Sequence, residues 1–363
     1  MTAEALVLAA PRRFERRRYA LPDIGESEGV LRIEACGLCG TDHEQYTGHL
    51  ASSHAFIPGH EVIGVLEAAG PRAQDRWGVS AGQRVAVEVF QSCRDCEACR
   101  AGLYRRCVKN GLRTMIGFMD ADAPPHLRGG YATHLALGPD AMLLPVPEAL
   151  DPVTASLFNP LGAGIRWGVE VPETKPGDIV AILGPGVRGL CAAAAAKAAG
   201  AGFVMITGLG PRDAGRLALA KRFGADLAVD VASDDPVRAL REAVGGLADI
   251  VVDVTAKAPA AFAQGLALAR TGGVVVVAGT RGGPGAPGFN PDHIVYKELR
   301  VVGALGVDVG PYRAALDMLV EGAFPFADLP RQVAGFDDLE PLIQAMAGET
   351  AATAPVHGVF APT

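Results

Sequence analysis

The pattern of apolar and polar positions changes midway along the chain. From Asp178 onward, short apolar runs alternate with alanine-rich or amphipathic runs of helical length. Apolar runs of this length between helical segments are typical of the buried strands of a parallel, doubly wound sheet. The predicted strands are 179–183, 203–207, 249–254 and 274–279, and the predicted helical runs are 191–200, 216–224 and 260–270.

The residues before this point have a different texture. They are rich in Gly and Pro and carry short β-prone runs at 30–34, 62–67, 84–89 and 131–136. Short strands separated by turn residues favour a partly antiparallel, barrel-like domain. The change falls near Asp151. The last part of the chain breaks the strand–helix alternation, so we expect it to return to the first domain.

Composition and charge narrow the possible partners. The chain has 363 residues, of which 49% are hydrophobic and 20% charged, and a net charge of −7. This balance fits two soluble domains and argues against a nucleic-acid or anionic-membrane partner. No apolar run approaches the roughly 20 residues of a membrane helix. The N-terminus lacks the charged segment followed by an apolar segment that marks a signal peptide, so we expect a cytoplasmic protein.

A basic run near the N-terminus comprises Arg12, Arg13, Arg16, Arg17 and Arg18. Such a run favours a solvated strand face over a binding patch.

Four of the seven cysteines are crowded into fifteen residues. They follow the pattern C-x2-C-x2-C-x7-C at Cys93, Cys96, Cys99 and Cys107. Short spacings let four thiolates converge on one tetrahedral ion, and a loop with so few apolar residues needs a metal to fold. We therefore predict a structural zinc site. An iron–sulfur cluster or four reduced surface thiols are the less favoured alternatives.

A second candidate site involves polar residues in apolar surroundings. His60 and Glu61 interrupt a strand-like run, and Cys39 lies upstream between two glycines in "ACGLCGTDHEQ". A thiolate and an imidazole are preferred zinc ligands. Asp42 could accept a hydrogen bond from the second ring nitrogen of a bound histidine, and Thr41 offers a hydroxyl that could relay a proton. We predict that His60 binds zinc and that Glu61 is a further ligand or a supporting carboxylate.

The third motif opens the α/β half. The run "AILGPGVRGLCAAAAAKAAG" contains the pattern G-x-G-x-x-G between a strand and a helix. Glycines let the backbone approach a pyrophosphate at the helix N-terminus. The predicted cofactor-binding residues of this turn are Gly184, Gly186, Val187 and Gly189.

The choice between NAD and NADP depends on the end of the next strand. An acidic residue is expected there in NAD-binding proteins, but Gly208 stands in its place, and Arg212 and Arg216 follow. A missing acid with arginine nearby favours the 2′-phosphate of NADP. Asp213 and Asp230 are close enough in sequence to leave NAD open.

These motifs, in this order, resemble the zinc-dependent medium-chain dehydrogenase/reductase family, which includes alcohol, sorbitol and threonine dehydrogenases. The resemblance covers nearly the whole chain. The residues Gly59, His60, Glu61, Gly64 and Gly70 resemble the zinc signature of that family. The four-cysteine run resembles the family's structural zinc lobe.

The resemblance implies a two-domain architecture. We expect a β-rich, GroES-like catalytic domain over 1–158 and 305–363, with the zinc lobe at 92–108. We expect a Rossmann coenzyme domain, a doubly wound parallel sheet, over 159–304. It also implies a homodimer or homotetramer, two zinc ions per chain and NAD(P).

The resemblance further implies roles for single residues. Cys39 and His60 would bind the catalytic zinc, Thr41 would be the first relay hydroxyl, and Asp42 would support the site. The zinc would stabilise an alkoxide, Thr41 would pass the proton outward, and hydride would move from the carbinol carbon to the nicotinamide.

Two positions depart from the family pattern. The family's third protein ligand is usually Cys, Glu or Asp, but the matching segment "SLFNPLGAGIRWG" has Asn159 there. An amide oxygen is a weaker zinc ligand, so either Asn159 or Glu61 completes the site. The distal relay histidine of the family is replaced by Glu44, with His43 one residue earlier, so either could end the relay, or neither.

The predicted function is therefore a zinc-dependent alcohol or polyol dehydrogenase acting on a small alcohol or carbonyl compound. The alternatives are a zinc-independent quinone or enoyl reductase and a non-catalytic cofactor-binding protein. The presence of both Cys39 and His60 argues against the reductase, whereas Asn159 favours the non-catalytic reading. The substrate itself stays open.

Overall fold

The structure is a computed structural model that describes residues 1–50, 52–256, 258–280, 285–350 and 354–362. The chain forms two compact units. Unit 1 comprises residues 1–158, 308–321 and 326–363, and unit 2 comprises residues 159–307 and 322–325. None of the helices in the described residues is long and apolar enough to cross a membrane.

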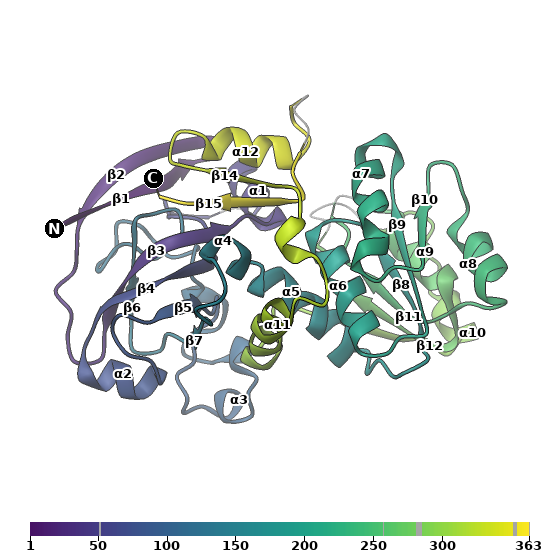
Figure 1. The fold of residues 1–363 in the computed structure, drawn as a ribbon, viewed down its shortest axis with the longest axis horizontal. Helices are drawn as coiled ribbons and strands as arrows, with labels where there is room; N and C mark the ends of the chain where they lie inside the picture. The colour runs from purple at the N-terminus through teal and green to yellow at the C-terminus, as the bar shows by residue number, and fades with distance from the viewer. Residues whose placement is uncertain (51, 257, 281–284, 351–353, 363) are drawn as a thin grey trace. The chain divides into compact units, whose positions relative to one another are not determined.

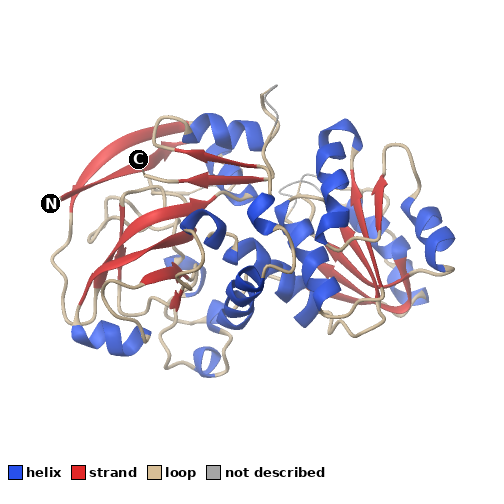
Figure 2. Ribbon diagram, viewed as in Figure 1, coloured by secondary structure: helices blue, strands red, loops and turns tan. Residues whose placement is uncertain are grey.

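Unit 1 is built on a largely antiparallel sheet (Figures 1 and 2). Its seven strands include the path β14-β15-β3-β4-β5-β7, and β6 pairs with β3. A separate hairpin is formed by β1 (Thr2–Ala10) and β2 (Arg13–Ala20). The sheet strands are β3 (Gly29–Gly37), β4 (Glu61–Ala69), β5 (Arg84–Val87), β6 (His134–Leu137), β7 (Leu143–Pro145), β14 (Arg331–Ala334) and β15 (His357–Phe360).

Short helices connect and cover these strands. They are α1 (Gly40–Thr47), α2 (Pro71–Trp77), α3 (Glu97–Arg100), η1 (Tyr104–Arg106), η2 (Gly111–Thr114), α4 (Pro152–Ala155), α11 (Val309–Glu321), η5 (Phe326–Asp328) and α12 (Leu339–Met346). The end of the chain enters this unit because β15 pairs antiparallel with β3 and parallel with β14.

The basic run on β2 is a solvated strand face. Arg16 and Arg18 pair with Glu4 on β1 at 2.6 and 2.8 Å, and Arg17 pairs with Glu15 at 2.7 Å. Arg12 pairs with Glu349 at 2.7 Å, outside the hairpin. The arginines of the run are thus paired with carboxylates of the chain itself, which agrees with the interpretation of the run as a charged surface.

Unit 2 has a six-stranded parallel sheet in the order β10-β9-β8-β11-β12-β13. The strands are β8 (Ile179–Leu183), β9 (Phe203–Gly208), β10 (Leu227–Asp230), β11 (Ala248–Asp253), β12 (Ala269–Val277) and β13 (Arg300–Gly303). The helical segments are α5 (Phe158–Ile165), η3 (Arg166–Glu170), α6 (Val187–Ala198), α7 (Gly210–Ala220), η4 (Lys221–Phe223), α8 (Pro236–Val244), α9 (Ala261–Leu268) and α10 (Asp292–Tyr296).

Helices lie on both faces of this sheet, with α6 and α7 on one side and α8 and α9 on the other (Figure 1). All residues of the central strands β8 and β11 except Ile179 and Asp249 are buried, which explains their largely apolar sequence. The α/β fold class, a GroES-like β-rich part and a Rossmann-type sheet, is confirmed. The sequence pattern missed β10 and β13, because these edge strands are only partly buried and carry no continuous apolar run.

Candidate active site

Strand register brings Cys39 and His60 together. Strands β3 and β4 are antiparallel neighbours in which Gly37 pairs with Glu61. Cys39 follows β3 and His60 immediately precedes β4, so both lie at the same end of this strand pair. Cys39 Sγ and His60 Nε2 are 3.2 Å apart. A tetrahedral zinc ion with ordinary bond lengths would hold sulfur and nitrogen about 3.5 Å apart, so this donor pair fits zinc.

Asp42 supports this pair from the first turn of α1. Its Oδ2 accepts a hydrogen bond from Cys39 N at 2.8 Å, and Thr41 N lies 3.3 Å from Cys39 Sγ, which together form a capping box. Asp42 Oδ1 lies 3.9 Å from His60 Nδ1. Because His60 Nε2 faces the thiol, the carboxylate faces the other ring nitrogen. A carboxylate in this place orients a metal-binding imidazole.

Glu61 lies apart from this group. Among the described residues, the candidate ligand atoms within 4.8 Å of one another here come from Cys39, Asp42 and His60. Glu61 is buried, and its Oε2 lies only 2.4 Å from where a Cβ on Gly37 would be. The glycine therefore makes room for the Glu61 carboxylate beside β3.

The candidate relay residues lie along α1. Thr41 and Glu44 are partly exposed, whereas His43 is 7% exposed. His43 Nε2 lies 2.8 Å from Glu349 Oε1, and Arg12 also donates to this carboxylate. The hydrogen bonds from Arg12 and His43 lower the pKa of Glu349 to about 2. His43 is thus engaged with a residue near the end of the chain.

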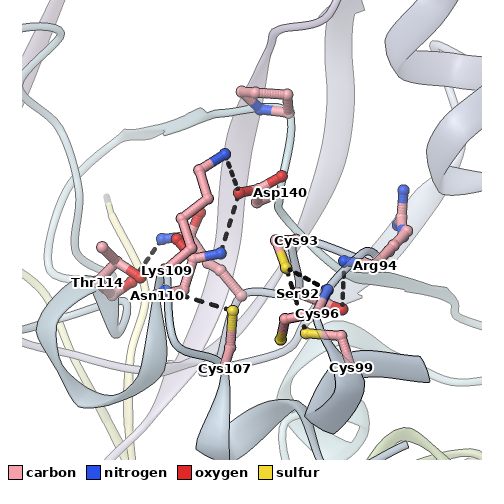
Figure 3. A network of polar contacts seen from close by, with 12 residues as sticks. Ser92, Cys93, Arg94, Cys96, Cys99, Cys107, Lys109, Asn110, Thr114 and Asp140 are labelled. Carbon is pink, nitrogen blue, oxygen red and sulfur yellow. Dashed lines mark hydrogen bonds and ion pairs between the residues drawn. The ribbon is translucent and has the colours of Figure 1, made fainter. Parts of the chain in front are cut away.

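The four cysteines of the lobe converge (Figure 3). Their sulfur atoms lie within 4.8 Å of one another, and those of Cys93 and Cys99 are 3.7 Å apart. Tetrahedral zinc bound to thiolates places sulfurs about 3.8 Å apart, whereas a disulfide would place them near 2 Å. The donor set therefore fits zinc. Asp140 anchors the lobe through Lys109 Nζ and Asn110 Nδ2, each at 3.0 Å.

The glycine-rich turn connects β8 to α6. Gly184 has φ +102°, a conformation that favours glycine. A Cβ on Gly189 would lie 1.8 Å from Gly184 O, so helix and turn approach too closely for any other residue. Among the described residues, nothing lies within 4 Å of a Cβ built on Gly186, the N-cap of α6. The turn thus leaves open backbone at a helix N-terminus, as a dinucleotide site requires.

The end of β9 explains the missing acid. A Cβ on Gly208 would lie 2.8 Å from Pro185 Cγ and 3.0 Å from Asp213 Cβ, so a larger side chain meets both. Asp213 is buried and accepts from Leu209 N at 3.0 Å and from Arg216 at 3.2 Å. Asp230 accepts from Gly210 N at 2.7 Å. Both carboxylates bind the loop's own backbone.

Unit 2 also holds Asn159 and a residue that sequence reasoning missed. Arg188, inside the glycine-rich turn, lies over the Trp167 ring at 5.3 Å. Its Nη2 donates to Asn159 Oδ1 at 3.4 Å. The signal was present in the sequence as a charged residue between Gly186 and Gly189. Tyr131 in unit 1 was also missed, since it reads as an ordinary strand aromatic.

Comparisons with known proteins agree with these features. Residues 25–148 match the model of the alcohol dehydrogenase GroES-like domain, and residues 188–321 match that of zinc-binding dehydrogenases. The chain is 68% identical to a probable alcohol dehydrogenase of Mycobacterium tuberculosis, over 99% of this chain and 98% of that protein. It is 32% identical to sorbitol dehydrogenase of Bacillus subtilis, over 76% and 74% of the two chains. A protein of Sinorhizobium meliloti described as a zinc-binding dehydrogenase, solved with NADP bound, matches with a TM-score of 0.82 and 28% identity, covering 100% of both chains.

Proposed function

The chain belongs to the zinc-dependent medium-chain dehydrogenase/reductase family, and from that premise we propose how its residues serve an alcohol dehydrogenase. The reaction is hydride transfer between the carbinol carbon of an alcohol or polyol and NAD(P). The observation that carries the proposal is the Cys39–His60 pair, 3.2 Å apart and backed by the buried Asp42. When bound, zinc supplies Lewis-acid chemistry to a substrate oxygen, and the nicotinamide supplies the redox chemistry.

Cys39 Sγ and His60 Nε2 would hold the catalytic zinc, and Asp42 would keep the imidazole in place. For a further ligand we favour Glu61 over Asn159. The amide oxygen of Asn159 accepts a hydrogen bond from Arg188, and a neutral amide is the weaker zinc ligand. Binding by Glu61 would require its carboxylate to leave its place beside Gly37. E61Q should then lower zinc content, whereas N159A should not.

Thr41 would accept the proton from the substrate side. Residues two positions apart on a helix face different directions, whereas residues three apart are neighbours. From Thr41, the neighbour is Glu44 rather than His43. His43 is also bound to Glu349. We therefore place the proton on Glu44 after Thr41, with His43 fixing the position of α1.

Unit 2 would bind the coenzyme at the glycine-rich turn, through Gly184, Gly186, Val187 and Gly189. We favour NADP, because the acids near Gly208 are engaged with loop backbone and Arg212 is 67% exposed there. The Arg212 and Arg216 side chains would then meet the 2′-phosphate. R212A/R216A is expected to weaken NADPH binding at least tenfold and to change NADH binding little, by fluorescence titration.

Unit 1 would be the catalytic domain and the four cysteines would hold a second, structural zinc. The seven cysteines form no disulfide, which supports a reducing, cytoplasmic location.

The test begins with zinc per chain in protein purified without chelator, followed by an alcohol panel with NAD and NADP. We expect two zinc ions and NADP-linked oxidation. C39S should leave one zinc and abolish turnover. Full turnover in C39S would overturn the proposal in favour of a zinc-independent reductase.

A further inference from the structure

Three buried polar atoms beside the Cys39–His60 pair make no hydrogen bond within the described part of the chain. They are the hydroxyl of Tyr131, Oδ1 of Asp42 and Nδ1 of His60. The exposed fractions of these residues are 0%, 2% and 5%. Since buried polar groups are almost always paired, their occurrence around one candidate metal site calls for a shared explanation.

The donors and acceptors of the three atoms balance. The tyrosine hydroxyl and the Nδ1–H of a histidine bound to metal through Nε2 each supply one proton. Asp42 Oδ1 is a carboxylate oxygen that can accept both, since the other oxygen, Oδ2, already accepts from Cys39 N. His60 Nδ1 lies 3.9 Å from Asp42 Oδ1, a short adjustment away from a hydrogen bond.

Backbone pairing fixes the tyrosine beside the histidine segment. Tyr131 N donates to Pro58 O at 3.0 Å, and Gly130 N donates to Gly59 O at 2.8 Å. A Cβ on Gly59 would lie 2.7 Å from the Tyr131 ring. The glycine therefore lets the ring pack against the backbone of the residue that precedes His60. Phe360 packs edge-on against the ring, with 5.5 Å between the centroids. The ring thus has little freedom. Burial, and after it the charge of Asp42, raises the pKa of the Tyr131 hydroxyl well above its usual value.

We infer that Tyr131 is a positioning residue of the catalytic zinc site. Its hydroxyl donates to Asp42 Oδ1, and this bond holds the carboxylate so that it accepts from His60 Nδ1 and keeps His60 Nε2 directed at Cys39 Sγ. The inference rests on the proposed function, since it requires zinc at this pair. It makes the tyrosine the outer member of a chain that runs Tyr131–Asp42–His60.

Another buried acceptor lies on the same helix. Gln45 Oε1 also lacks a hydrogen bond among the described residues, and Gln45 Nε2 donates to Gly117 O at 3.0 Å. A tyrosine that donated to Gln45 would stabilise the fold without acting on the metal. Asp42 accounts better for the unpaired atoms, because it satisfies the tyrosine and the histidine together.

The experiment compares zinc-loaded wild type with Y131F, which removes one oxygen and keeps the ring. Y19F is the matched control, because the Tyr19 hydroxyl is also buried and makes no hydrogen bond in the described residues, but stands on β2 away from the metal pair. Zinc affinity is measured by competition with a chromogenic chelator. Cobalt(II) substitution then reports the thiolate–metal geometry through its absorption bands. Y131M replaces Y131F if the latter does not yield folded protein.

We expect Y131F to raise the dissociation constant of the catalytic zinc about tenfold and to shift the cobalt bands, with Y19F like wild type. The double variant Y131F/D42N should bind the catalytic zinc no more weakly than D42N alone. Y131F within twofold of wild type would overturn the inference, as would additive effects of Y131F and D42N, which would assign the hydroxyl to Gln45. A wild type that holds only the cysteine-lobe zinc would instead refute the proposed function itself.

Discussion

At the scale of single residues, we expect His357 to lower the free energy of unfolding as the pH falls. It is 1% exposed on β15, and its Nε2 lies 3.4 Å from Ser156 Oγ. Burial, and after it the charge of Arg331, lowers the pKa of His357 to about 3, from 6.5. The unfolded chain therefore binds this proton first as the pH falls. The stabilising effect of the neutral imidazole is complete above about pH 6.5 and is lost progressively toward pH 3.

As the pH falls from 8 to 5, protonation linked to His357 should lower the unfolding free energy of wild type by about 2 kcal/mol. H357Q cannot titrate and should lose that much less over the same range. Urea unfolding at the two pH values measures the difference, and H49Q, at an exposed histidine, is the control. An H357Q slope equal to that of wild type would show that His357 is protonated in the fold without penalty.

Glu88 acts in the opposite direction. It is 1% exposed, receives a hydrogen bond from Tyr104 Oη at 2.7 Å and another from Phe90 N at 3.1 Å. Burial raises the pKa of Glu88 to about 8, from 4.5. The unfolded chain releases this proton first as the pH rises, so stability is lost from about pH 4.5 up to pH 8.

E88Q stays neutral, so its stability relative to wild type should improve by roughly 2–4 kcal/mol between pH 5 and pH 8. The same urea measurements test this, with the exposed Glu26→Gln as control. Because His357 and Glu88 change stability in opposite directions over overlapping ranges, the wild-type profile alone would conceal both. An unchanged difference between E88Q and wild type would mean that Glu88 ionises freely in the fold.

At the scale of elements, the proposed structural zinc predicts that the cysteine lobe depends on a bound metal for its fold. Within the described part of the chain, its apolar cluster consists of buried Val89, Phe90 and Tyr104, with Met115 and Met142 partly buried against them. We expect C107S to lose one zinc and to become open to trypsin after Arg100 and Arg106, while the β3–β4 sheet stays intact. Mass spectrometry of timed digests locates the cuts. The control C191S, at a buried cysteine of α6, should resist trypsin as well as wild type does. A C107S lobe that stays uncut would refute a structural role for the metal.

The same scale shows what sequence could predict. The strand predicted at 179–183 matches β8 residue for residue, because a central parallel strand must be apolar throughout. The register of β3 on β4 could not be predicted, since it depends on two bulges. That register pairs Gly37 with Glu61 and so brings Cys39 and His60 to the same end of the two strands. Residue types and spacing identified the candidate ligands, but only the pairing between strands decides which of them lie close together.

At the scale of the whole molecule, the change of sequence texture near Asp151 and the family resemblance both predicted two domains. Contacts between residues far apart in sequence limit how far such predictions extend. The glycine-rich turn and the four-cysteine lobe could be read from local patterns, because each depends on short spacings. Cys39 and His60 are 21 positions apart and meet only through the pairing of β3 with β4. The contact of Arg188 with Asn159 could not be read from local patterns either, since it joins residues 29 positions apart on separate helices. Tyr131 was missed for the same reason: its role depends on the neighbours that folding brings to its hydroxyl.

Assembly is the remaining property of the whole molecule, and unit 2 indicates where it would occur. β13 is the last strand of the parallel sheet in the described residues, and large apolar side chains near it are exposed: Val295 by 70%, Tyr296 by 80%, Val301 by 37% and Leu305 by 59%. An apolar sheet edge of this kind is a template for pairing with a second copy. We propose that the chain forms a homo-oligomer through this edge.

V301K/L305K should therefore convert the oligomer to monomers, because two added charges per copy would face each other across the paired edge. Light scattering coupled to gel filtration measures the mass at micromolar concentration. V320K is the control, since Val320 is 47% exposed on α11 of unit 1. A monomeric wild type would remove the basis for the edge as an interface. An oligomeric V301K/L305K would move the interface elsewhere, and zinc content equal to wild type in the variant would show that the change is confined to assembly.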